Sequence, residues 1–495
     1  MSFKVAFIGA GSIGFTRRLL SDLLTVPEFG DIQVAFTDIN EHNLDRVTQL
    51  CQRDIDSNGR NIRIQSTLDR REALRGARYI FNTVRIGGLD AFKLDIDIPL
   101  TYGVDQCVGD TLCAGGIMYG QRGIAAVMEF CRDIREVAEP GALLLNYANP
   151  NAMITWACNQ YGGVNTVGLC HGVQGGHRQI ATVLGLKKEE VDIICAGINH
   201  QTWYIKVRHN GEDLTGKLLE AFEKHPVFSK TEKVRIDMLR RFGYYSTESN
   251  GHLSEYVPWY RKRAEEIPEW ISLDAWIHGE TGGYLRVCME GRNWFETDFP
   301  NWMQQPPQQY IPEARGQEHG SYIIEGLETG RIYRGHFNVV NQGTLSNLPE
   351  DAIVEVPGYV DRNGIGIPRV GSLPLGCAAV CNASISVQRL AVEAAVKGDD
   401  HLLRQAMMMD PLVGAVLNPP EIWQMTDDML IAQETWLPQY KKAIKEAKDR
   451  REQGNRIPTR DYRGAARLKV KSVEEMRENR AAAAKNAGAA DKGVL

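Results

Sequence analysis

The sequence predicts an α/β fold whose N-terminal part is a doubly wound, mostly parallel sheet. A short apolar run, residues 3–8, leads directly into the glycine-rich turn of residues 9–14. Further apolar runs alternate with amphipathic segments up to about residue 200, which is the pattern of repeated β-α units. The chain has 495 residues, of which 43% are hydrophobic and 24% charged. This length and composition suit a globular protein of about two to four domains.

The first of these units has the features of a dinucleotide site. The run 3–8 reads as a strand, 15–24 as a helix and 32–37 as a second strand that ends at an acid. Glycines in the turn permit a tight bend, close approach of the backbone to a pyrophosphate and close helix–strand packing. The acid stands where it would bind ribose hydroxyls, and its charge disfavours the extra phosphate of NADP. We therefore predict NAD in a Rossmann-like domain; the alternative is an ordinary βα turn with glycines for packing. The residues expected to bind NAD here are Gly9, Gly11, Ser12, Ile13, Gly14 and Asp38.

Polar side chains follow later strands of the same predicted sheet. Asn82 lies in the strand 79–84, where a Rossmann-like domain places its nicotinamide-side loop, and we add it to the NAD-binding residues. Asp110 lies in a glycine-rich loop, 108–117, ahead of a predicted helix at 120–137; it is either an acid presented to a ligand or a turn former. Asn149 stands at the tip of the strand 141–147, stopped by a proline, where its amide could bind a hydroxyl or cap the next helix.

A thiol and an imidazole end two further apolar runs. The predicted strand 165–169 leads to Cys170, and the run 191–197 leads to His200, so the two could meet at one edge of a parallel sheet. Two protein ligands are too few for a closed structural zinc site, and a metal with open positions is a catalytic one. The alternative is a buried cysteine and a hydrogen-bonded histidine without a metal.

Beyond residue 211 the alternation becomes irregular, as expected of a second region that covers the substrate. We predict three parts: residues 1–200, a Rossmann-like domain that carries the metal ligands; 201–440, an α+β domain for substrate binding, catalysis and oligomerisation; and 441–495, a charged, alanine-rich tail without chemistry. This organisation is like that of lactate and malate dehydrogenases. The stretch 247–260 is dense in polar and aromatic residues, which suits either a sugar-binding wall or a loop packed by its own aromatics.

Charge and cysteine usage exclude several classes of partner. A formal net charge of −5 gives no strong field for nucleic acid or an anionic membrane. The ten cysteines are scattered without a CxxC pair, the N-terminus does not read as a signal peptide, and no uninterrupted apolar stretch approaches the roughly 18 residues that span a bilayer. We therefore expect a protein of the reduced cytoplasm that binds neither nucleic acid nor membrane.

Six motifs in this order resemble those of the family 4 glycoside hydrolases, and within that family its α-galactosidase branch. The resemblance runs from about residue 4 to residue 440. The matching stretches are Ile8-Gly-Ala-Gly-Ser12, Gly109-Asp-Thr-Leu with Gly115-Gly-Ile, Asn149-Pro150, Cys170-His171, Ala196-Gly-Ile-Asn-His200, and Thr247-Glu-Ser with His252 and Glu255-Tyr256.

This resemblance implies hydrolysis of α-glycosides, most of all α-galactosides, with NAD and a divalent metal, usually Mn²⁺. The family departs from the usual pair of carboxylates flanking an oxocarbenium ion. NAD takes hydride from C3, the metal polarises the resulting ketone, a base removes the C2 proton and the aglycone leaves from C1. Water then adds and the hydride returns. The resemblance also implies a homodimer or homotetramer, with a small glycoside as the only other partner.

The same resemblance implies a role for each motif residue. Cys170 and His200 correspond to the metal ligands. Asp110 corresponds to the general acid, and Tyr256 is the first candidate for the base, with His252 or Glu248 in reserve. The expected catalytic residues are therefore Asp110, Tyr256 and His252, and the expected substrate-binding residues are Asn149, His171 and Glu248.

Residues 171 and 172 bear on the choice of substrate. Branches that act on unphosphorylated sugars resemble this chain in having a histidine after the cysteine, and the sequence has no clear Lys/Arg cluster for a 6-phosphate. Gly172 departs from the serine of α-galactosidases, so an α-galacturonidase, an α-glucuronidase or another α-hexosidase of the family remains an alternative. A simple NAD-dependent dehydrogenase of sugars or hydroxy acids is a second alternative, and a non-catalytic NAD sensor a third.

Overall fold

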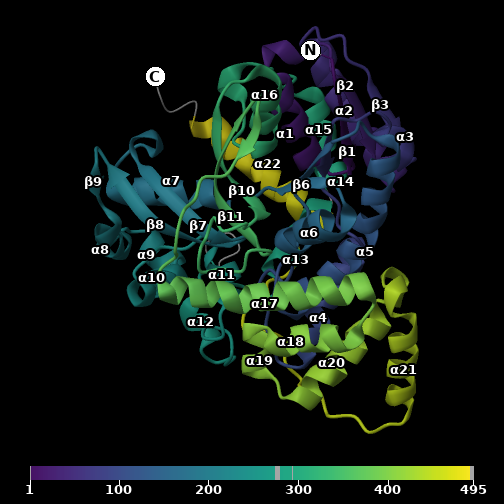
Figure 1. The fold of residues 1–495 in the computed structure, drawn as a ribbon, viewed down its shortest axis with the longest axis vertical. Coiled ribbons are helices and arrows are strands. Elements are labelled where there is room, and N and C mark those ends of the chain that lie inside the picture. Colours follow the sequence, from purple (N-terminus) through teal and green to yellow (C-terminus); the bar gives the residue numbers. More distant parts are fainter. Residues whose placement is uncertain (1, 274–278, 293, 491–495) are drawn as a thin grey trace.

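The computed structural model describes residues 2–273, 279–292 and 294–490 of the chain. The last five residues of the predicted tail, 491–495, lie outside the described part. A sheet runs through the centre of the molecule, helices cover both of its faces, and a layer of helices lies below it in the view of Figure 1.

Six strands form the parallel part of the sheet, in the order β3-β2-β1-β4-β5-β6. This is the order of a doubly wound dinucleotide-binding sheet, and it confirms the predicted α/β fold class. The strands are β1 (Lys4–Ile8), β2 (Gln33–Thr37), β3 (Ile64–Thr67), β4 (Tyr79–Asn82), β5 (Leu143–Asn146) and β6 (Asn165–Gly168).

Alternation of side chains along β1 shows why the sheet is buried on both faces. Val5 and Phe7 belong to the apolar core beneath α1 (Ile13–Leu24), α2 (Glu41–Ser57) and α16 (His319–Thr329). Ala6 and Ile8 belong to the opposite core beneath α5 (Cys113–Val137) and α6 (Asn151–Ala157). A strand that is buried on both faces reads as one continuous apolar run, and this is why the run 3–8 was recognisable in the sequence.

The sheet continues beyond β6 as an antiparallel half. Its strands follow in the order β10 (Tyr333–Val340), β11 (Ile353–Asp361), β7 (Asp192–Ile198), β8 (Gln201–His209) and β9 (Glu212–Asp213), with β12 (Gly364–Gly366) paired to β11. Antiparallel pairing is what a short hairpin allows, whereas parallel pairing needs a long crossover. The α+β character predicted for the second region is confirmed.

The expectation that Cys170 and His200 follow parallel strands is wrong. The hairpin of β10 and β11 lies between β6 and β7, and each pairing in this series is antiparallel, so β7 runs opposite to β6. Single bridges, Asn338 to Gly168 and Glu355 to Gly197, join this hairpin to its neighbours. The sequence could not reveal this because the hairpin comes more than 130 residues after β7 in the chain.

Two predicted boundaries also differ from the structure. The helix expected at 120–137 begins at Cys113, so the second half of the glycine-rich stretch 108–117 is helical. A Cβ atom at Gly116 would lie 2.4 Å from the backbone of Thr111, which shows that this glycine serves close packing at the start of α5. The sequence also predicts a helix at 383–397, and this helix begins instead at Leu375 and forms α17 (Leu375–Lys397).

The helical layer below the sheet is built on α17. It comprises α4 (Gly88–Thr101), α17, α18 (Asp400–Met409), α19 (Pro411–Val416), α20 (Pro419–Ala432) and α21 (Lys441–Glu452) (Figure 1). Among the described residues, α17 alone is long and apolar enough to cross a bilayer, and 56% of its apolar window is buried within the protein. Its packing on α5 and α6 is that of a core helix.

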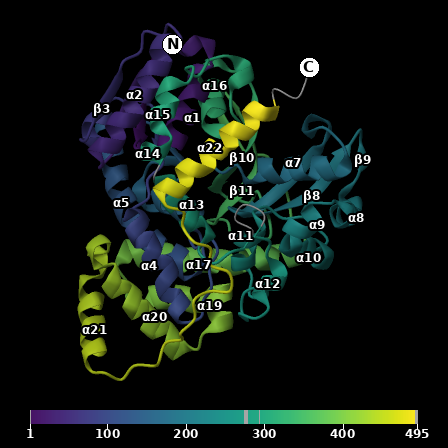
Figure 2. The ribbon, with the colours of Figure 1, turned by 180° about the vertical axis from the view of Figure 1, so that it is seen from behind.

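The remaining helices lie beside β3, around the antiparallel half and over the end of the sheet that bears the glycine turn. They are α3 (Arg70–Leu74), α7 (Gly172–Leu184), α8 (Leu218–Lys224), α9 (Phe228–Thr231), α10 (Lys233–Phe242), α11 (Asn250–Tyr256), α12 (Ile267–Trp270), α13 (Gly283–Arg292), α14 (Trp294–Thr297), α15 (Phe299–Gln304) and α22 (Val473–Ala490). Figure 2 shows the chain after α21 turning back along the molecule and ending in α22.

Candidate active site

The glycine turn between β1 and α1 is held by hydrogen bonds to the end of β2. Gly9 has φ of 87°, and its N–H donates to the carbonyl of Thr37 at 3.0 Å. The N–H of Gly11 donates to Oδ2 of Asp38 at 2.8 Å. Helix α1 begins at Ile13, directly after Ser12. The first-turn N–H groups of a helix have no partner within the helix, so this turn offers an anion-binding end beside an oriented carboxylate.

Neighbouring atoms, as well as the backbone conformation, leave no room for a side chain at Gly9 and Gly11 in this turn. A Cβ atom at Gly9 would lie 3.0 Å from Val84, and one at Gly11 would lie 2.8 Å from Oδ2 of Asp38. The exposed Gly14 lies in the first turn of α1, where the indole of Trp294 would stand 3.4 Å from an added Cβ. The backbone can therefore come close to a ligand here, which is what the sequence motif predicts.

Asn82 lies at the C-terminal end of β4, in the middle of the same edge. Its Nδ2 donates to Oδ1 of Asn146, at the end of β5, at 2.9 Å. Its Oδ1 is buried and has no hydrogen-bond partner among the described residues. Because β1, β4, β5 and β6 are parallel, the glycine turn, Asn82, Asn149 and Cys170 all follow strand ends at one edge of the sheet.

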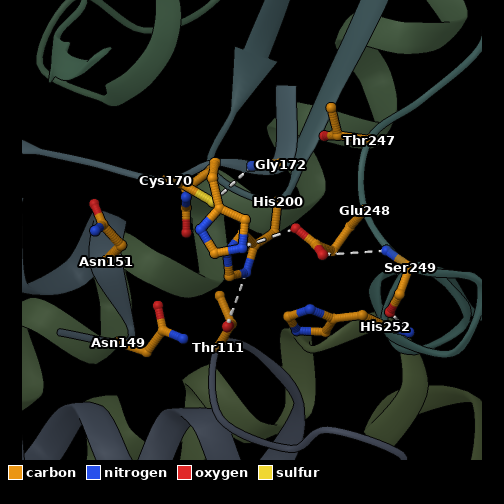
Figure 3. Close-up of polar contacts among 12 residues, drawn as sticks. Thr111, Asn149, Asn151, Cys170, Gly172, His200, Thr247, Glu248, Ser249 and His252 are labelled. Carbon is orange, nitrogen blue, oxygen red and sulfur yellow. Dashed lines mark hydrogen bonds and ion pairs between the residues drawn. The ribbon is translucent and has the colours of Figure 1, made fainter. Parts of the chain in front are cut away.

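Cys170, His200 and Glu248 form a cluster at the β6 end of this edge. One ligand atom from each lies within 4.8 Å of the other two, and Nε2 of His200 is 3.7 Å from Oε2 of Glu248. Figure 3 shows the His200 ring between the Cys170 sulfur and the Glu248 carboxylate. Thiolate, imidazole and carboxylate are three metal-ligand types, and ligands of one ion lie about 4–5 Å apart at most.

A missing side chain makes room for this carboxylate. Gly172 is the first residue of α7, and a Cβ atom there would lie 3.0 Å from Oε2 of Glu248 and 3.6 Å from the sulfur of Cys170. The N–H of Gly172 donates to that sulfur at 3.4 Å. The departure at position 172 noted in the sequence therefore leaves the carboxylate free to lie against the cysteine.

The pKa values of Cys170 and Glu248 are shifted in different ways within the cluster. Burial raises the pKa of the Cys170 thiol well above its ordinary value, and the carboxylates of Glu355 and Glu248 add to this. Burial also opposes ionisation of Glu248, but His200, His252 and His171 outweigh it and lower its pKa. A cation that bound here would find an ionised carboxylate and would have to displace a proton from sulfur.

Asp110 lies beside the cluster, held by three donors. Its Oδ2 accepts hydrogen bonds from Arg85 at 3.2 Å and from Nδ2 of Asn149 at 3.1 Å, and its Oδ1 accepts one from the hydroxyl of Thr111 at 2.9 Å. The same hydroxyl is 3.2 Å from Nδ1 of His200. Thr111 thus connects the acid to the metal-type cluster, and the side chain of Asp110 is fully buried.

The loop that carries Asp110 is fixed from behind by Glu255. Its buried carboxylate accepts the N–H groups of Cys107, Val108 and Gly109, the last at 3.1 Å. Burial raises the pKa of Glu255 to about 7, against the opposing effect of Arg261 and these N–H groups. Glu255 therefore positions the loop and contacts none of the cluster ligands by hydrogen bond among the described residues.

Tyr256 and His252 lie on α11, beside His200. The rings of His200 and His252 have centroids 4.8 Å apart, and those of His252 and Tyr256 are 5.4 Å apart. The hydroxyl of Tyr256 donates to the carbonyl of Asn199 at 3.3 Å. Burial, with the charges of Glu248 and Asp110, raises the pKa of this phenol well above its ordinary value. It remains protonated unless a positive charge is added nearby.

His252 is neutral and has a free nitrogen. Burial and the neighbouring His200 lower the pKa of its imidazole to about 4. Its Nε2 is buried and makes no hydrogen bond within the described part of the chain. Figure 3 shows this ring projecting toward the space beside His200 and Glu248. Such an orphaned acceptor or donor is a candidate contact for a ligand.

His171 lies at the surface, and its ionic partner is not one of the other candidates. Its side chain is 65% exposed, and its Nδ1 is 3.6 Å from Oε1 of Glu318. It forms the N-terminal boundary of α7. The remaining candidates, Cys170, His200, Glu248, His252, Tyr256, Asp110 and Asn149, are linked to one another by the contacts given above.

Three residues of the site were not singled out in the sequence. Arg85 directly follows the predicted strand 79–84 and Thr111 directly follows Asp110, but nothing local distinguished them from neighbouring loop residues. Glu355 did leave a signal, because it is an acid that interrupts the apolar run at the start of β11. It is buried, accepts a hydrogen bond from Asn199 at 3.4 Å, and burial raises its pKa to about 8.

Comparison with known proteins agrees with these observations. Residues 4–186 match the model of the family 4 glycosyl hydrolases, and residues 195–413 match that of the family 4 glycosyl hydrolase C-terminal domain. An α-galactosidase of Rhizobium meliloti is 58% identical over 483 residues, which cover 97% of this chain and 98% of the relative. An α-galactosidase of Bacillus subtilis is 34% identical over 442 residues, which cover 88% of this chain and 100% of the relative.

A solved structure shares the fold over the same range. A 6-phospho-α-glucosidase from gut microorganisms, in complex with NAD and glucose-6-phosphate, superposes with a TM-score of 0.73 at 25% identity, and covers 88% of this chain and 99% of its own. The family models, the two relatives and this fold agree with the ordered motifs of the sequence. The chain belongs to the family 4 glycosyl hydrolases.

Proposed function

We propose that this chain is an α-galactosidase that uses NAD and a divalent cation, Mn²⁺, in the cytoplasm, as a homodimer or homotetramer. The observation that carries the proposal is the cluster of Cys170, His200 and Glu248 at the edge of the sheet that bears the glycine turn. The 58% identity to an α-galactosidase supports the substrate class.

The residues present fit a catalytic cation. Cys170, His200 and Glu248 offer three different ligand atoms, and a cation bound by three protein ligands keeps positions open for sugar oxygens. The buried Nε2 of His252 has no hydrogen bond among the described residues, and Figure 3 shows this ring beside the carboxylate of Glu248. Thiolate and imidazole also suit Zn²⁺, so the identity of the metal must be tested directly.

The glycine turn fits a dinucleotide. Gly9 and Gly11 leave no side chain between the backbone and a pyrophosphate, and the end of α1 favours an anion. Asp38 is bound through Gly11 and Asn40 N–H groups and keeps lone pairs for ribose hydroxyls. The buried, unpartnered Oδ1 of Asn82 offers an acceptor where the nicotinamide would lie.

When bound, NAD would supply transient oxidation of the sugar at C3. The cation would supply Lewis-acid polarisation of the oxygen on that carbon. The chain's own residues then have distinct tasks. Asp110, oriented by Arg85 and Asn149, would in its protonated form give a proton to the leaving oxygen. Tyr256, whose ring lies 5.4 Å from that of His252 beside the cluster, would take the C2 proton.

The test is hydrolysis of para-nitrophenyl α-galactoside with and without each cofactor. We expect turnover only with NAD, Mn²⁺ and a reductant that keeps Cys170 as a thiol, with no accumulation of NADH. In D₂O the product should carry deuterium at C2. Hydrolysis that persists after removal of NAD and metal, or product without deuterium at C2, would contradict the proposed chemistry.

A panel of aryl glycosides identifies the sugar. We expect the α-galactoside to be cleaved faster than the α-glucoside and the α-galacturonide. Faster cleavage of the galacturonide would assign the chain to a uronide-cleaving branch and would leave the cofactor chemistry intact. Steady formation of NADH with a free sugar would instead indicate a simple dehydrogenase.

A further inference from the structure

The C-terminal segment 456–490, here called the strap, is bound to the rest of the chain at several points between residues 456 and 480. After α21 it runs past α20 and α4, where Ile457 exchanges hydrogen bonds with Gln424 and the N–H of Arg460 donates to the carbonyl of Thr101 at 2.7 Å. It then crosses the loop before α13 and ends in α22 (Figure 2). The sequence predicted only a tail without chemistry.

The strap completes the shell of a buried carboxylate, Asp105. This side chain is fully buried and accepts hydrogen bonds from Arg261 and from the hydroxyl of Thr281. The strap adds two more donors, the hydroxyl of Tyr462 at 2.8 Å and the N–H of Ala465 at 2.9 Å, both to Oδ2. A buried charge that loses donors is costly, so these contacts hold the strap and Asp105 together.

Asp105 begins the loop that ends in Asp110. The carbonyls of Gln106 and Cys107, between the two acids, accept N–H groups of Gly282 at 2.8 Å and Tyr284 at 3.2 Å. The strap also binds this second segment, because the N–H of Thr281 donates to the carbonyl of Ala466 at 3.0 Å. The strap, the loop 105–110 and the segment from 279 onward are therefore three layers joined by hydrogen bonds.

The segment comprising α13 and α14, here called the cover, also reaches the nucleotide turn. Trp294 stands at van der Waals distance from the place of a Cβ on Gly14, and the ring of Phe295 lies 6.2 Å from that of His42 near the end of β2. The ring of Tyr284 lies 5.5 Å from the guanidinium of Arg85, the partner of Asp110. The cover thus contacts both halves of the active site.

The far end of the strap fastens the cover from outside. Arg480 on α22 forms an ion pair with Asp298, which follows α14 directly, and α22 packs on α14. Between the two ends of the strap, the N–H of Lys471 donates to Oε1 of Glu290 on α13 at 3.1 Å. Both sides of the cover are therefore attached to the strap.

We propose that the strap is a positioning element for the reaction: it sets the orientation of Asp110 through Asp105 and closes the cover over the nucleotide turn. The proposal rests on the proposed function in taking Asp110 as the acid. The matched family models end at residue 413, and the Bacillus subtilis relative is covered in full by 88% of this chain. The strap thus lies outside the matched models, although the alignment with the Rhizobium meliloti relative covers 97% of this chain.

Tyr462→Phe tests the link to Asp110, because it removes one hydrogen bond and keeps the ring. A weakened acid matters most for poor leaving groups. We expect about a 10-fold lower kcat for methyl α-galactoside and less than a 3-fold loss for para-nitrophenyl α-galactoside. The matched control is Arg463→Ala on the same strap, whose side chain is 89% exposed and which should leave both rates unchanged. If Asp110→Asn shows the leaving-group dependence of an acid, equal losses of Tyr462→Phe on the two substrates, or none, would overturn the proposal.

Hydrogen–deuterium exchange measures the same link without any catalytic assumption. In Tyr462→Phe holoenzyme the N–H groups of residues 105–112 should exchange faster than in Arg463→Ala, while those of β1 should not change. Unchanged exchange in the loop would overturn the proposal even if activity fell. If the loop loosens but Asp110→Asn shows no leaving-group dependence, the role assigned to Asp110 fails and the strap's positioning role stands.

Arg480→Ala tests closure of the cover. We expect the Kd of NAD, measured by calorimetry on the metal-loaded enzyme, to rise about 5-fold, because the cover loses its outer attachment. The Kd of Mn²⁺ should not change, since the cluster does not contact the strap. An unchanged Kd for NAD, or equal weakening of both, would overturn this part of the proposal.

Discussion

The glycine turn at the end of β1 and the metal-type cluster at the end of β6 lie on one edge of the sheet but are assembled differently. The turn is made by residues 9–14 and 37–40, from backbone N–H groups and one carboxylate. The cluster draws its side chains from the β6–α7 connection, the β7–β8 connection and the loop before α11. A local motif tolerates distant change, whereas a cluster of side chains depends on every segment that supplies one. Variants should therefore affect the two halves separately.

Cys170→Ser is expected to give the largest difference between loss of metal-supported turnover and loss of NAD affinity. A hydroxyl is a much weaker ligand than a thiolate, so metal-supported turnover should fall about 1,000-fold or more. The Kd of NAD should stay within about twofold of the original, since the turn shares no residue with the cluster. Calorimetry with NAD and with Mn²⁺ measures both affinities. Cys377→Ser, in the helical layer, is the control for loss of a thiol.

Loss of NAD binding together with metal binding in Cys170→Ser would contradict the comparison. It would mean that the two halves form one cooperative unit, in which the strand ends cannot hold the turn once the cluster is disturbed.

Glu355→Gln examines how a buried carboxyl next to the cluster lowers the stability of the folded protein as pH rises. The folded pKa of Glu355 is about 8, above its ordinary value of 4.5. The folded protein therefore keeps a proton that the unfolded chain releases, and stability falls as pH rises from 4.5 through 8. Between pH 5 and pH 9 the free energy of unfolding should fall by about 3–5 kcal/mol more in the original protein than in the variant.

Urea titrations of the metal-free proteins at several pH values measure this difference. Glu350→Gln is the matched control, because that side chain is exposed at the turn before β11. Parallel pH profiles for the original protein and Glu355→Gln would show that the carboxyl is ionised in the folded state at all these pH values.

The sequence was sufficient for the turn and insufficient for the cluster, for a physical reason. Gly9, Gly11 and Asp38 act through local geometry, so spacing in the chain fixes their positions in space. Cys170 and His200 were identified by type and by resemblance, but the antiparallel hairpin that separates their strands comes from residues 333–361. No local pattern predicts that Thr111 connects the acid to His200, or that residues of the tail hold Asp105.

Asp110→Asn tests a residue on the cluster side of the site, by comparing substrates with poor and good leaving groups. The amide cannot donate the same proton, so hydrolysis of methyl α-galactoside should fall about 100-fold or more. A nitrophenolate leaves without help, so para-nitrophenyl α-galactoside should lose less than about 10-fold. Rates of both substrates at saturating NAD and metal provide the measurement. Equal losses would show that Asp110 acts by orientation of Arg85 and Asn149.

Gly11→Ala should disturb the turn alone. The added methyl would lie 2.8 Å from Oδ2 of Asp38 and would displace the carboxylate that the turn orients. Overpacking of this kind costs about 1–3 kcal/mol, so the Kd of NAD should rise about 10- to 100-fold. Gly216→Ala, where an added Cβ meets nothing within 4 Å, is the control. A parallel loss of Mn²⁺ affinity would again argue against separate halves.

The smallest effect is expected at Gly172. This residue combines features of the turn and of the cluster, because the absence of its side chain makes room for the carboxylate of Glu248. An added Cβ would lie 3.0 Å from Oε2 of Glu248, a contact that a shift of a few tenths of an ångström relieves. Gly172→Ala should therefore weaken Mn²⁺ binding by less than about 10-fold, corresponding to at most about 1.4 kcal/mol. Gly172→Ser should weaken it less than the alanine variant does, because its hydroxyl can donate to the displaced carboxylate. Mn²⁺ titrations of the three proteins decide between these outcomes. If alanine and serine were equally harmful, or either abolished binding, the carboxylate of Glu248 would have no freedom to move and the glycine would be essential to the site.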